Sequence, residues 1–136
     1  MDSSDILEGI MSKPVVTVEY FEPVKKAMHA MIDKDIGNVV VVEKGNPVGI
    51  LTERDIIRKL AGGKEVVNLK VGDIMSKPLI TASPKTKNFE ALEMLQKNKI
   101  RRLPVVLDGK LVGIGTDKDL TYWVIKVGYA PNPPPY

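Results

Sequence analysis

One pattern occurs twice in the chain, at an offset of 64 residues. Residues 10–14 read Ile-Met-Ser-Lys-Pro, and residues 74–78 repeat them without change. At the same offset and without a gap, 16 of the 51 positions in 10–60 are identical to their counterparts in 74–124. Because two copies are too few for a stacked solenoid, the repeat predicts two similar halves that pack face to face about a pseudo-twofold axis.

The first copy begins with an extended segment and an amphipathic helix. Residues 14–18 form a short β-rich run that starts at a proline, and we expect it to be extended. A helix is predicted from about Glu22, with Pro23 in its first turn. Apolar residues then recur at the spacing of one helix face. These residues are Val24, Ala27, Met28, Met31 and Ile32.

A hairpin and a second helix complete the first copy. Two runs rich in β-branched residues, 38–43 and 47–51, flank a Gly-containing turn, which predicts a β-hairpin. Thr52 opens a helix that ends before residues 62–63, a pair of glycines. The complete unit is therefore predicted to be β-α-β-β-α.

The second copy predicts the same order of elements. Its hairpin is expected at 103–107 and 111–115, and Thr116 opens its last helix. We therefore expect a fold of the α+β class whose halves are α/β-like. The predicted boundaries are 1–63 for the first repeat, 64–128 for the second, and 129–136 for a Pro-rich tail that is extended or disordered.

The side-chain inventory excludes several classes of protein. Cysteine is absent and His29 is the single histidine, which excludes disulfides, thiol catalysis, zinc–thiolate sites and His-rich metal sites. No apolar run approaches the ~20 residues that cross a bilayer, and the acidic start of the chain is unlike a signal peptide. We therefore expect a cytoplasmic protein with no membrane segment and no metal site.

Charge is unevenly divided along the sequence. The formal net charge is +3. Residues 1–68 hold 9 basic and 11 acidic side chains, a net charge of −2, whereas residues 69–136 hold 11 basic and 6 acidic ones, a net charge of +5. Such a change of sign suggests an anionic partner for the second half.

A Thr-x-x-Asp motif follows the predicted hairpin in both copies, as Thr52 with Asp55 and as Thr116 with Asp119. The spacing alone favours a structural role, because a capping threonine and an acid three residues later form a capping box. The same helix N-terminus also offers N–H groups to a phosphate, and a carboxylate there can accept hydrogen bonds from ribose hydroxyls. The two interpretations are compatible, and the second predicts two related nucleotide sites.

These motifs resemble those of a tandem pair of CBS domains, also called a Bateman module. The similarity covers residues 5–125 and rests on the paired Ile-Met-Ser-Lys-Pro segments, the Arg-Leu-Pro-Val-Val strand at 102–106, and the paired Gly-x-x-Thr-x-x-Asp endings. The resemblance implies two β-α-β-β-α repeats packed sheet to sheet as one module. It also implies adenine nucleotides bound in the clefts between the repeats, and pairing of the module into a homodimer.

The same resemblance implies a role for each candidate residue. Asp55 and Asp119 would hold ribose hydroxyls, with Thr52 and Thr116 near the ribose and the phosphate. The adenine edge would be read by main chain in two segments. These segments contain Val16 and Thr17 in the first copy, and Ile80 and Thr81 in the second.

Basic residues supply the candidate phosphate contacts. In the second copy Arg101 and Arg102 precede Pro104 in the strand, and a planar guanidinium can pair with two phosphate oxygens. The first copy has Gly-Asn at the positions of the two arginines, so we expect the two sites to be unequal. Arg54 and Lys118, inside the Thr-x-x-Asp motifs, are further candidates. The alternative for all these cations is a solvated surface.

Three classes of function follow from these features. The favoured one is a non-catalytic regulatory module that binds AMP, with ADP or ATP as alternatives, and relays the signal to an effector protein. The sequence leaves S-adenosylmethionine and guanine nucleotides open. The alternative is a nucleic-acid-binding protein that uses the basic second half, but a net charge of +3 and 5% aromatic residues support it weakly. An enzyme is not expected, since no P-loop and no acid–base pair stand out.

Overall fold

The computed structural model describes residues 5–128, which form two compact units. The central unit comprises residues 15–80, and the terminal unit combines residues 5–14 with residues 81–128. The predicted boundary after residue 63 follows the sequence repeat, whereas the compact units divide after residues 14 and 80. Each Ile-Met-Ser-Lys-Pro segment therefore belongs to the unit that holds the other copy's hairpin. The Pro-rich tail lies outside the described residues.

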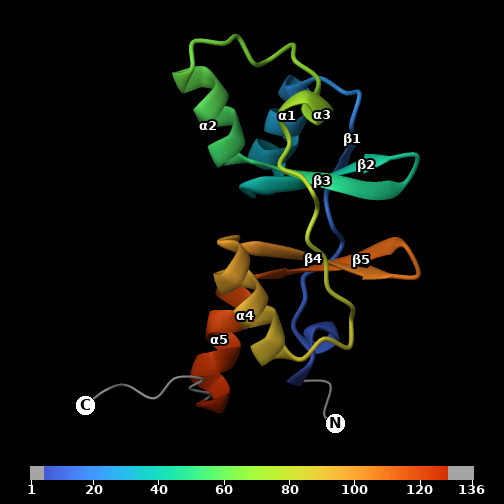
Figure 1. The fold of residues 1–136 in the computed structure, drawn as a ribbon, viewed down its shortest axis with the longest axis vertical. Helices are drawn as coiled ribbons and strands as arrows, with labels where there is room; N and C mark the ends of the chain where they lie inside the picture. Colours follow the sequence, from blue (N-terminus) through green and yellow to red (C-terminus); the bar gives the residue numbers. More distant parts are fainter. Residues whose placement is uncertain (1–4, 129–136) are drawn as a thin grey trace. The chain divides into compact units, whose positions relative to one another are not determined.

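The central unit is a three-stranded sheet with helices on one face. Strand β2 lies in the middle, parallel to β1 and antiparallel to β3. Figure 1 shows the helices of this unit gathered on one side of the sheet. The elements are β1 (Thr17–Glu19), α1 (Val24–Lys34), β2 (Asn38–Glu43), β3 (Asn46–Thr52), α2 (Glu53–Ala61) and α3 (Val71–Ile74).

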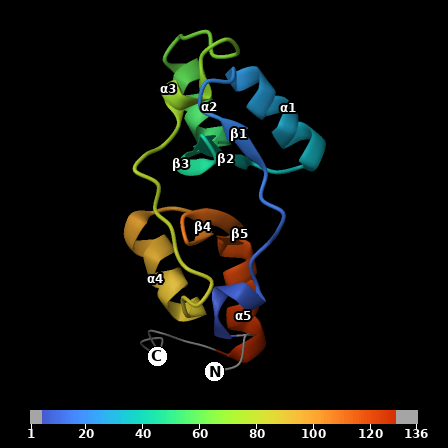
Figure 2. The ribbon, with the colours of Figure 1, turned by 90° about the vertical axis from the view of Figure 1, so that its right-hand side faces the viewer.

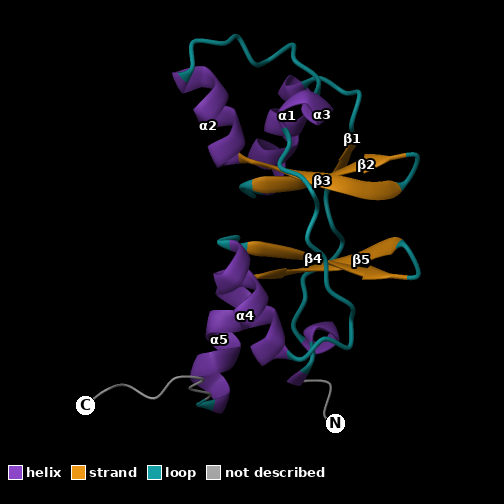
Figure 3. Ribbon diagram, viewed as in Figure 1, coloured by secondary structure: helices purple, strands orange, loops and turns teal. Residues whose placement is uncertain are grey.

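The terminal unit is an antiparallel strand pair, β4 with β5, and two longer helices cover one face of the pair (Figure 3). Its elements are the 3-10 helix η2 (Leu7–Gly9), α4 (Asn88–Asn98), β4 (Arg102–Leu107), β5 (Lys110–Thr116) and α5 (Asp117–Val127). The predicted α+β class is confirmed. No helix in residues 5–128 is both long and apolar enough to cross a membrane.

Both predicted hairpins are present, and they turn in the same way. Lys44 and Gly45 have φ angles of 52° and 83°, and Asp108 and Gly109 have φ angles of 51° and 80°. Two consecutive positive φ angles are typical of a two-residue type I′ turn, whose twist matches that of the flanking strands. Glycine adopts such angles without steric cost, so the Gly in each turn favours this hairpin.

The terminal unit differs from the repeat prediction at its first strand. Among the described residues, the counterpart of β1 is a single parallel bridge between Ala82 and Val105. The bridge has two main-chain hydrogen bonds, from Ala82 N to Pro104 O at 3.0 Å and from Val106 N to Ala82 O at 2.8 Å. The prediction of a full strand at this place is wrong.

Two prolines explain the shortened pairing. In the central unit, the N–H groups of Val40 and Tyr20 donate across the β1–β2 pair at 3.1 and 2.9 Å. The residues 64 positions later are Pro104 and Pro84, and proline has no N–H to donate. The ladder is therefore cut at both ends, and only its middle remains.

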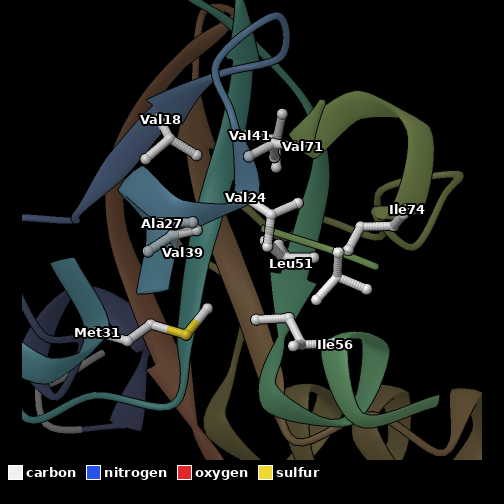
Figure 4. Close-up of a cluster of buried hydrophobic side chains, with 11 residues drawn as sticks. Val18, Val24, Ala27, Met31, Val39, Val41, Leu51, Ile56, Val71 and Ile74 are labelled. Carbon is white, nitrogen blue, oxygen red and sulfur yellow. The ribbon is translucent and has the colours of Figure 1, made fainter. Parts of the chain in front are cut away.

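The core of the central unit lies between its sheet and its helices (Figure 4). Side chains from all six elements contribute, so the burial of apolar area stabilises the whole unit together. The buried set is Val18, Val24, Ala27, Met31, Val39, Val41, Leu51, Ile56, Val66, Val71 and Ile74.

Helix α1 differs from its prediction in two details. It begins at Val24 with Pro23 at the N-cap, so the proline is not in the first turn. Val24, Ala27 and Met31 are buried as predicted, but Ile32 is 75% exposed. At about 100° per residue, Ile32 lies about 80° around the helix axis from Val24. The predicted apolar stripe is therefore too wide by one residue.

Each Ile-Met-Ser-Lys-Pro segment pairs with the second strand of a hairpin. Ser76 and Ile50 exchange two main-chain hydrogen bonds, at 2.8 and 3.2 Å, in the central unit. Ser12 and Ile114 exchange two, at 2.8 and 3.0 Å, in the terminal unit. Figure 2 shows the N-terminal segment, in dark blue, running beside the elements of the terminal unit. The segment thus adds a bridge to the edge of a hairpin, as an extra strand would.

The methionines of these segments lie against glycines. A Cβ atom on Gly49 would come within 2.5 Å of the Sδ of Met75, and a Cβ on Gly113 would come within 2.5 Å of the Sδ of Met11. Both glycines belong to the repeated Val-Gly-Ile of the hairpin. The close approach of each segment therefore depends on a residue without a side chain.

Leu7 fills a position in the terminal unit that the repeat leaves empty. The central unit has the fully buried Leu51 on β3, whereas its counterpart on β5 is Gly115. A Cβ atom on Gly115 would lie 3.0 Å from the Cδ2 of Leu7, which is fully buried. Leu7 therefore packs beside Gly115 and fills the space that a side chain at this strand position, such as Leu51 in the central unit, would fill.

Candidate ligand-binding site

The Thr-x-x-Asp motif of the central unit forms a complete capping box at the start of α2. The main-chain N–H of Asp55 donates to the Oγ1 of Thr52 at 3.2 Å, and the main-chain N–H of Thr52 donates to the Oδ2 of Asp55 at 2.9 Å. The Thr52 hydroxyl also lies 3.1 Å from the same carboxylate oxygen. The capping interpretation of this motif is therefore confirmed, because each residue satisfies a free N–H of the other.

A third residue holds the same carboxylate. The hydroxyl of Ser76 donates to the Oδ1 of Asp55 at 2.8 Å. The Asp55 side chain is 8% exposed and is one of two buried polar or charged residues in the described part of the chain. With donors on both oxygens, the carboxylate is fixed in one orientation at the N-terminus of α2.

The terminal unit has the same three residue types in a looser arrangement. The N–H of Asp119 donates to the Oγ1 of Thr116 at 3.0 Å, so Thr116 caps α5. The hydroxyl of Ser12 donates to the Oδ2 of Asp119 at 3.2 Å. Within residues 5–128, Ser12 is the one donor within hydrogen-bond distance of this carboxylate. The carboxylate of Asp119 is therefore less constrained than that of Asp55.

The two serines were not among the predicted site residues. Ser12 and Ser76 lie in the repeated Ile-Met-Ser-Lys-Pro segments, which indicate the repeat but give no local sign of a ligand site. The one sequence signal for these serines is that the two segments are identical, so that a hydroxyl occurs at the same position in both copies. The partner of each serine is 107 or 21 residues away, which local spacing does not indicate.

The predicted arginines lie beside the start of α5. Arg102 on β4 is paired with Thr116 on β5, and directly opposite residues of an antiparallel pair present their side chains on the same face. The carbonyl of Arg101 accepts from the N–H of Asp117 at 2.9 Å, which joins the main chain of Arg101 to the first residue of α5. The buried Nε of Arg102 has no hydrogen-bond acceptor among the described residues.

The central unit has a neutral version of this neighbourhood. Asn38 is paired with Thr52, and the carbonyl of Gly37 accepts from the N–H of Glu53 at 3.0 Å. The strand pairing and the main-chain hydrogen bond to the first helix residue therefore occur in both units. The guanidinium groups at these two positions occur in the terminal unit. Arg54 and Lys118, the candidate cations within the two motifs, are both exposed.

The segments predicted to read adenine differ between the copies. Thr17 is the first residue of β1 and is paired with Val40, and the carbonyl of Val16 accepts from the N–H of Val40. Thr17 and Thr52 therefore pair with residues two apart on the same strand, β2. Ile80 is the last residue of the central unit and Thr81 is the first of the next segment, so this pair is divided between the two units.

The charge difference between the sequence halves is not a property of the compact units. Residues 15–80 hold 10 basic and 9 acidic side chains, a net charge of +1, and the other 70 residues hold 10 basic and 8 acidic ones, a net charge of +2. The difference arises because the acidic segment before residue 15 belongs to the terminal unit, and residues 69–80, which contain two lysines, belong to the central unit. The uneven charge therefore belongs to the two sequence halves and not to the two compact units.

The family of the chain follows from comparison with known proteins. The family model described as CBS domain matches twice, at residues 4–62 and 71–126. The chain belongs to the CBS domain family. The predicted tandem pair is confirmed, and the two matches correspond to the two copies of the sequence repeat.

Relatives of known sequence agree with this family. The chain is 39% identical over 114 residues to "Uncharacterized protein MK0525" of Methanopyrus kandleri, covering 82% of this chain and 58% of that protein. It is 36% identical over 110 residues to the mitochondrial CBS domain-containing protein CBSX3 of Arabidopsis thaliana, covering 76% of this chain and 53% of that protein. The chain thus spans little more than half the length of these two relatives.

Among solved structures, the CBS domain pair of protein MJ0100 is similar to the whole fold. The TM-score is 0.81 with 28% sequence identity, and the match covers 91% of this chain and 98% of that chain. That domain pair was crystallised in complex with 5′-methylthioadenosine and S-adenosyl-L-methionine.

Proposed function

We propose that this CBS domain pair is a non-catalytic regulatory module whose two units bind adenosine-containing ligands at the starts of α2 and α5. The supporting observation is that a carboxylate with a serine donor occurs twice at a Thr-capped helix N-terminus, as Asp55 and as Asp119. Each carboxylate accepts hydrogen bonds from a ribose, and the helix N-terminus favours negative charge nearby. Binding changes the relative stability of two conformations, and an effector protein responds to that change.

The nature of the ligand is the finer part of the proposal. Adenosine is common to AMP, ADP, ATP and the two ligands of the MJ0100 domain pair, so the ribose contact does not separate them. The arginines beside Thr116 favour a phosphate-bearing ligand in the terminal unit, because Arg102 has a buried Nε that a phosphate oxygen can satisfy. We therefore propose AMP as the ligand of that unit, with ADP and ATP as alternatives, and any adenosine compound as the ligand of the central unit.

Calorimetric titration tests the proposal directly. AMP, ATP and S-adenosylmethionine are added separately to the wild-type chain and to the Asp55→Asn, Asp119→Asn and double variants. Each single variant is expected to lose one site, and the double variant both, since asparagine keeps the size of the side chain but not its charge. No binding of any of the three by the wild type contradicts the proposal, as does unchanged binding by the double variant.

We also propose that the protein is cytoplasmic and pairs into a homodimer through its helices. Large apolar side chains are exposed on α2, at Ile57 and Leu60, and on α5, at Tyr122 and Ile125. Exposed apolar side chains of this size favour a protein–protein contact. Light scattering is expected to give twice the chain mass of 15.0 kDa, and a species of 15.0 kDa at all concentrations contradicts the dimer.

A further inference from the structure

The two oxygens of the Asp55 carboxylate differ in how much hydrogen-bonding capacity they have left. Each oxygen of an ionised carboxylate has about two acceptor positions. Oδ2 accepts from the N–H and from the hydroxyl of Thr52, at 2.9 and 3.1 Å, so both of its positions are used. Oδ1 accepts from the hydroxyl of Ser76 at 2.8 Å. One acceptor position is therefore left on this carboxylate.

A ribose that binds through both of its hydroxyls needs more than one acceptor position on the carboxylate. Its 2′ and 3′ hydroxyls are neighbouring donors, and a carboxylate that holds both must accept two hydrogen bonds. At Asp55 a second acceptor position becomes available when the hydroxyl of Ser76 turns away from Oδ1. Thr52 does not release the carboxylate, because its two contacts with Asp55 are part of the helix cap. Ser76 is exposed and its main chain is fixed to Ile50, so its hydroxyl can turn toward water by a rotation of χ1 alone.

We propose that the hydroxyl of Ser76 competes with a ribose hydroxyl for the Oδ1 of Asp55 and so sets the affinity of the central unit for adenosine-containing ligands. This inference rests on the proposed function. It assigns Ser76 a positioning role: its hydroxyl holds the carboxylate of the ligand-free protein and is released when ribose binds.

The terminal unit provides the internal control. Asp119 accepts one hydrogen bond from Ser12, at 3.2 Å and at an exposed position. Positions for two ribose hydroxyls therefore remain on this carboxylate while Ser12 stays in place. The competition is expected at Asp55 and not at Asp119, although the three residue types are the same in both units.

The experiment isolates the central site in the 136-residue chain with an Asp119→Asn background. AMP and S-adenosylmethionine, which carry the same ribose, are titrated calorimetrically into this protein with and without Ser76→Ala. We expect Ser76→Ala to lower the dissociation constant of both ligands about fivefold, the ratio that corresponds to one competing hydrogen bond. The Ser76→Thr variant, which keeps a hydroxyl, is expected to restore the original affinity.

Two controls separate competition from a general effect on structure. The 2′,3′-dideoxy analogue of AMP has no hydroxyls to compete, so its affinity is expected to be unaffected by Ser76→Ala. In an Asp55→Asn background, Ser12→Ala is expected to change AMP affinity less than about twofold, since Asp119 has unused positions. Thermal unfolding of each variant is measured alongside, to compare proteins that remain folded at the titration temperature.

The outcomes distinguish the inference from the proposed function. Wild-type binding of AMP with unchanged or weaker binding by folded Ser76→Ala overturns the competition and leaves the proposed function intact. An equal gain for AMP and for the dideoxy analogue also overturns it, because the effect then does not involve the ribose hydroxyls. Absence of AMP and S-adenosylmethionine binding in every protein overturns both.

Discussion

The central and terminal units derive from the same repeated sequence, yet they complete their structures in different ways. The central unit has a third strand, β1, and the terminal unit has one bridge in its place. The central unit buries Leu51 from its own hairpin, and the terminal unit buries Leu7 beside Gly115. The elements common to both are a first helix (α1 or α4), the hairpin with its type I′ turn, the serine segment paired with that hairpin, and the capped helix that follows. The comparison indicates that the units differ at the first strand and at the source of one core leucine, and share the remaining elements.

The same comparison applies to the candidate sites. Asp55 has three donors and a neutral neighbour, Asn38, across the strand pair from Thr52. Asp119 has one donor and the guanidinium of Arg102 across from Thr116. The carboxylate of Asp55 is therefore the more constrained of the two, and an arginine lies across the strand pair in the terminal unit alone. If both bind ligands as proposed, this difference predicts that the terminal unit prefers the ligand with more negative charge.

The largest expected effect tests whether Leu7 and Leu51 have matching roles. Both side chains are fully buried, and removal of a buried leucine side chain costs about 2–5 kcal/mol. We expect Leu7→Ala and Leu51→Ala each to lower the free energy of unfolding in this range, measured by urea denaturation. Hydrogen exchange is expected to increase first in β4, β5 and α5 for Leu7→Ala, and in β2, β3 and α1 for Leu51→Ala. Faster exchange in the central unit with Leu7→Ala would contradict the assignment of residues 5–14 to the terminal unit.

A smaller effect distinguishes the two glycines that contact methionine. A Cβ on Gly49 would meet the side chain of Met75 at 2.5 Å and also the main-chain oxygen of Ser76 at 3.0 Å, whereas a Cβ on Gly113 would meet Met11 side-chain atoms. A flexible methionine can move aside more easily than main chain. We expect Gly49→Ala to destabilise the protein by about 1–3 kcal/mol and Gly113→Ala by less, in thermal unfolding. An equal loss of stability would show that the main-chain contact is unimportant.

The smallest effect concerns the aspartates of the two Thr-x-x-Asp motifs. Asp55→Ala removes the acceptor of three donors, and Asp119→Ala removes the acceptor of one. A capping interaction contributes about 0.5–2 kcal/mol, so we expect Asp55→Ala to destabilise the protein near the upper end of this range. We expect Asp119→Ala to destabilise it less, because within residues 5–128 the carboxylate of Asp119 accepts one hydrogen bond at an exposed position and caps no helix N–H. Urea denaturation without ligand gives both values. A larger loss for Asp119→Ala would reverse the order of rigidity inferred for the two sites.

The sequence predicts local structure well because local structure depends on nearby residues. The hairpins, their Gly turns and the helices capped by Thr52 and Thr116 were predicted within a residue or two, since turn and cap chemistry lies within a few residues of each element. The exposure of Ile32 was missed because periodicity alone does not give the width of the buried face. The shortened first pairing of the terminal unit could have been predicted from Pro84 and Pro104, whose missing N–H groups are evident in the sequence.

The site itself was predicted in part. The Thr-x-x-Asp motifs gave the capping geometry, and the resemblance to CBS domains supplied the ribose role, which stays a prediction. The serine partners of the aspartates were missed because each reaches its carboxylate through pairing of a distant segment with the hairpin. The uneven charge of the sequence halves does not carry over to the compact units for the same reason. Contacts between residues far apart in the sequence depend on topology, which spacing does not specify.

The construction of the terminal unit from both ends of the described chain has a consequence for synthesis on the ribosome. Residues 15–80 emerge in one continuous stretch, and the central unit has all of its residues once that stretch has left the exit tunnel. Residues 5–14 emerge before that stretch but pack on β5, about a hundred positions later. Their apolar side chains, including Leu7, remain without their final partners throughout elongation. Closing so long a loop is slow and costs entropy, so this segment is made before the central unit and is among the last to reach its native place.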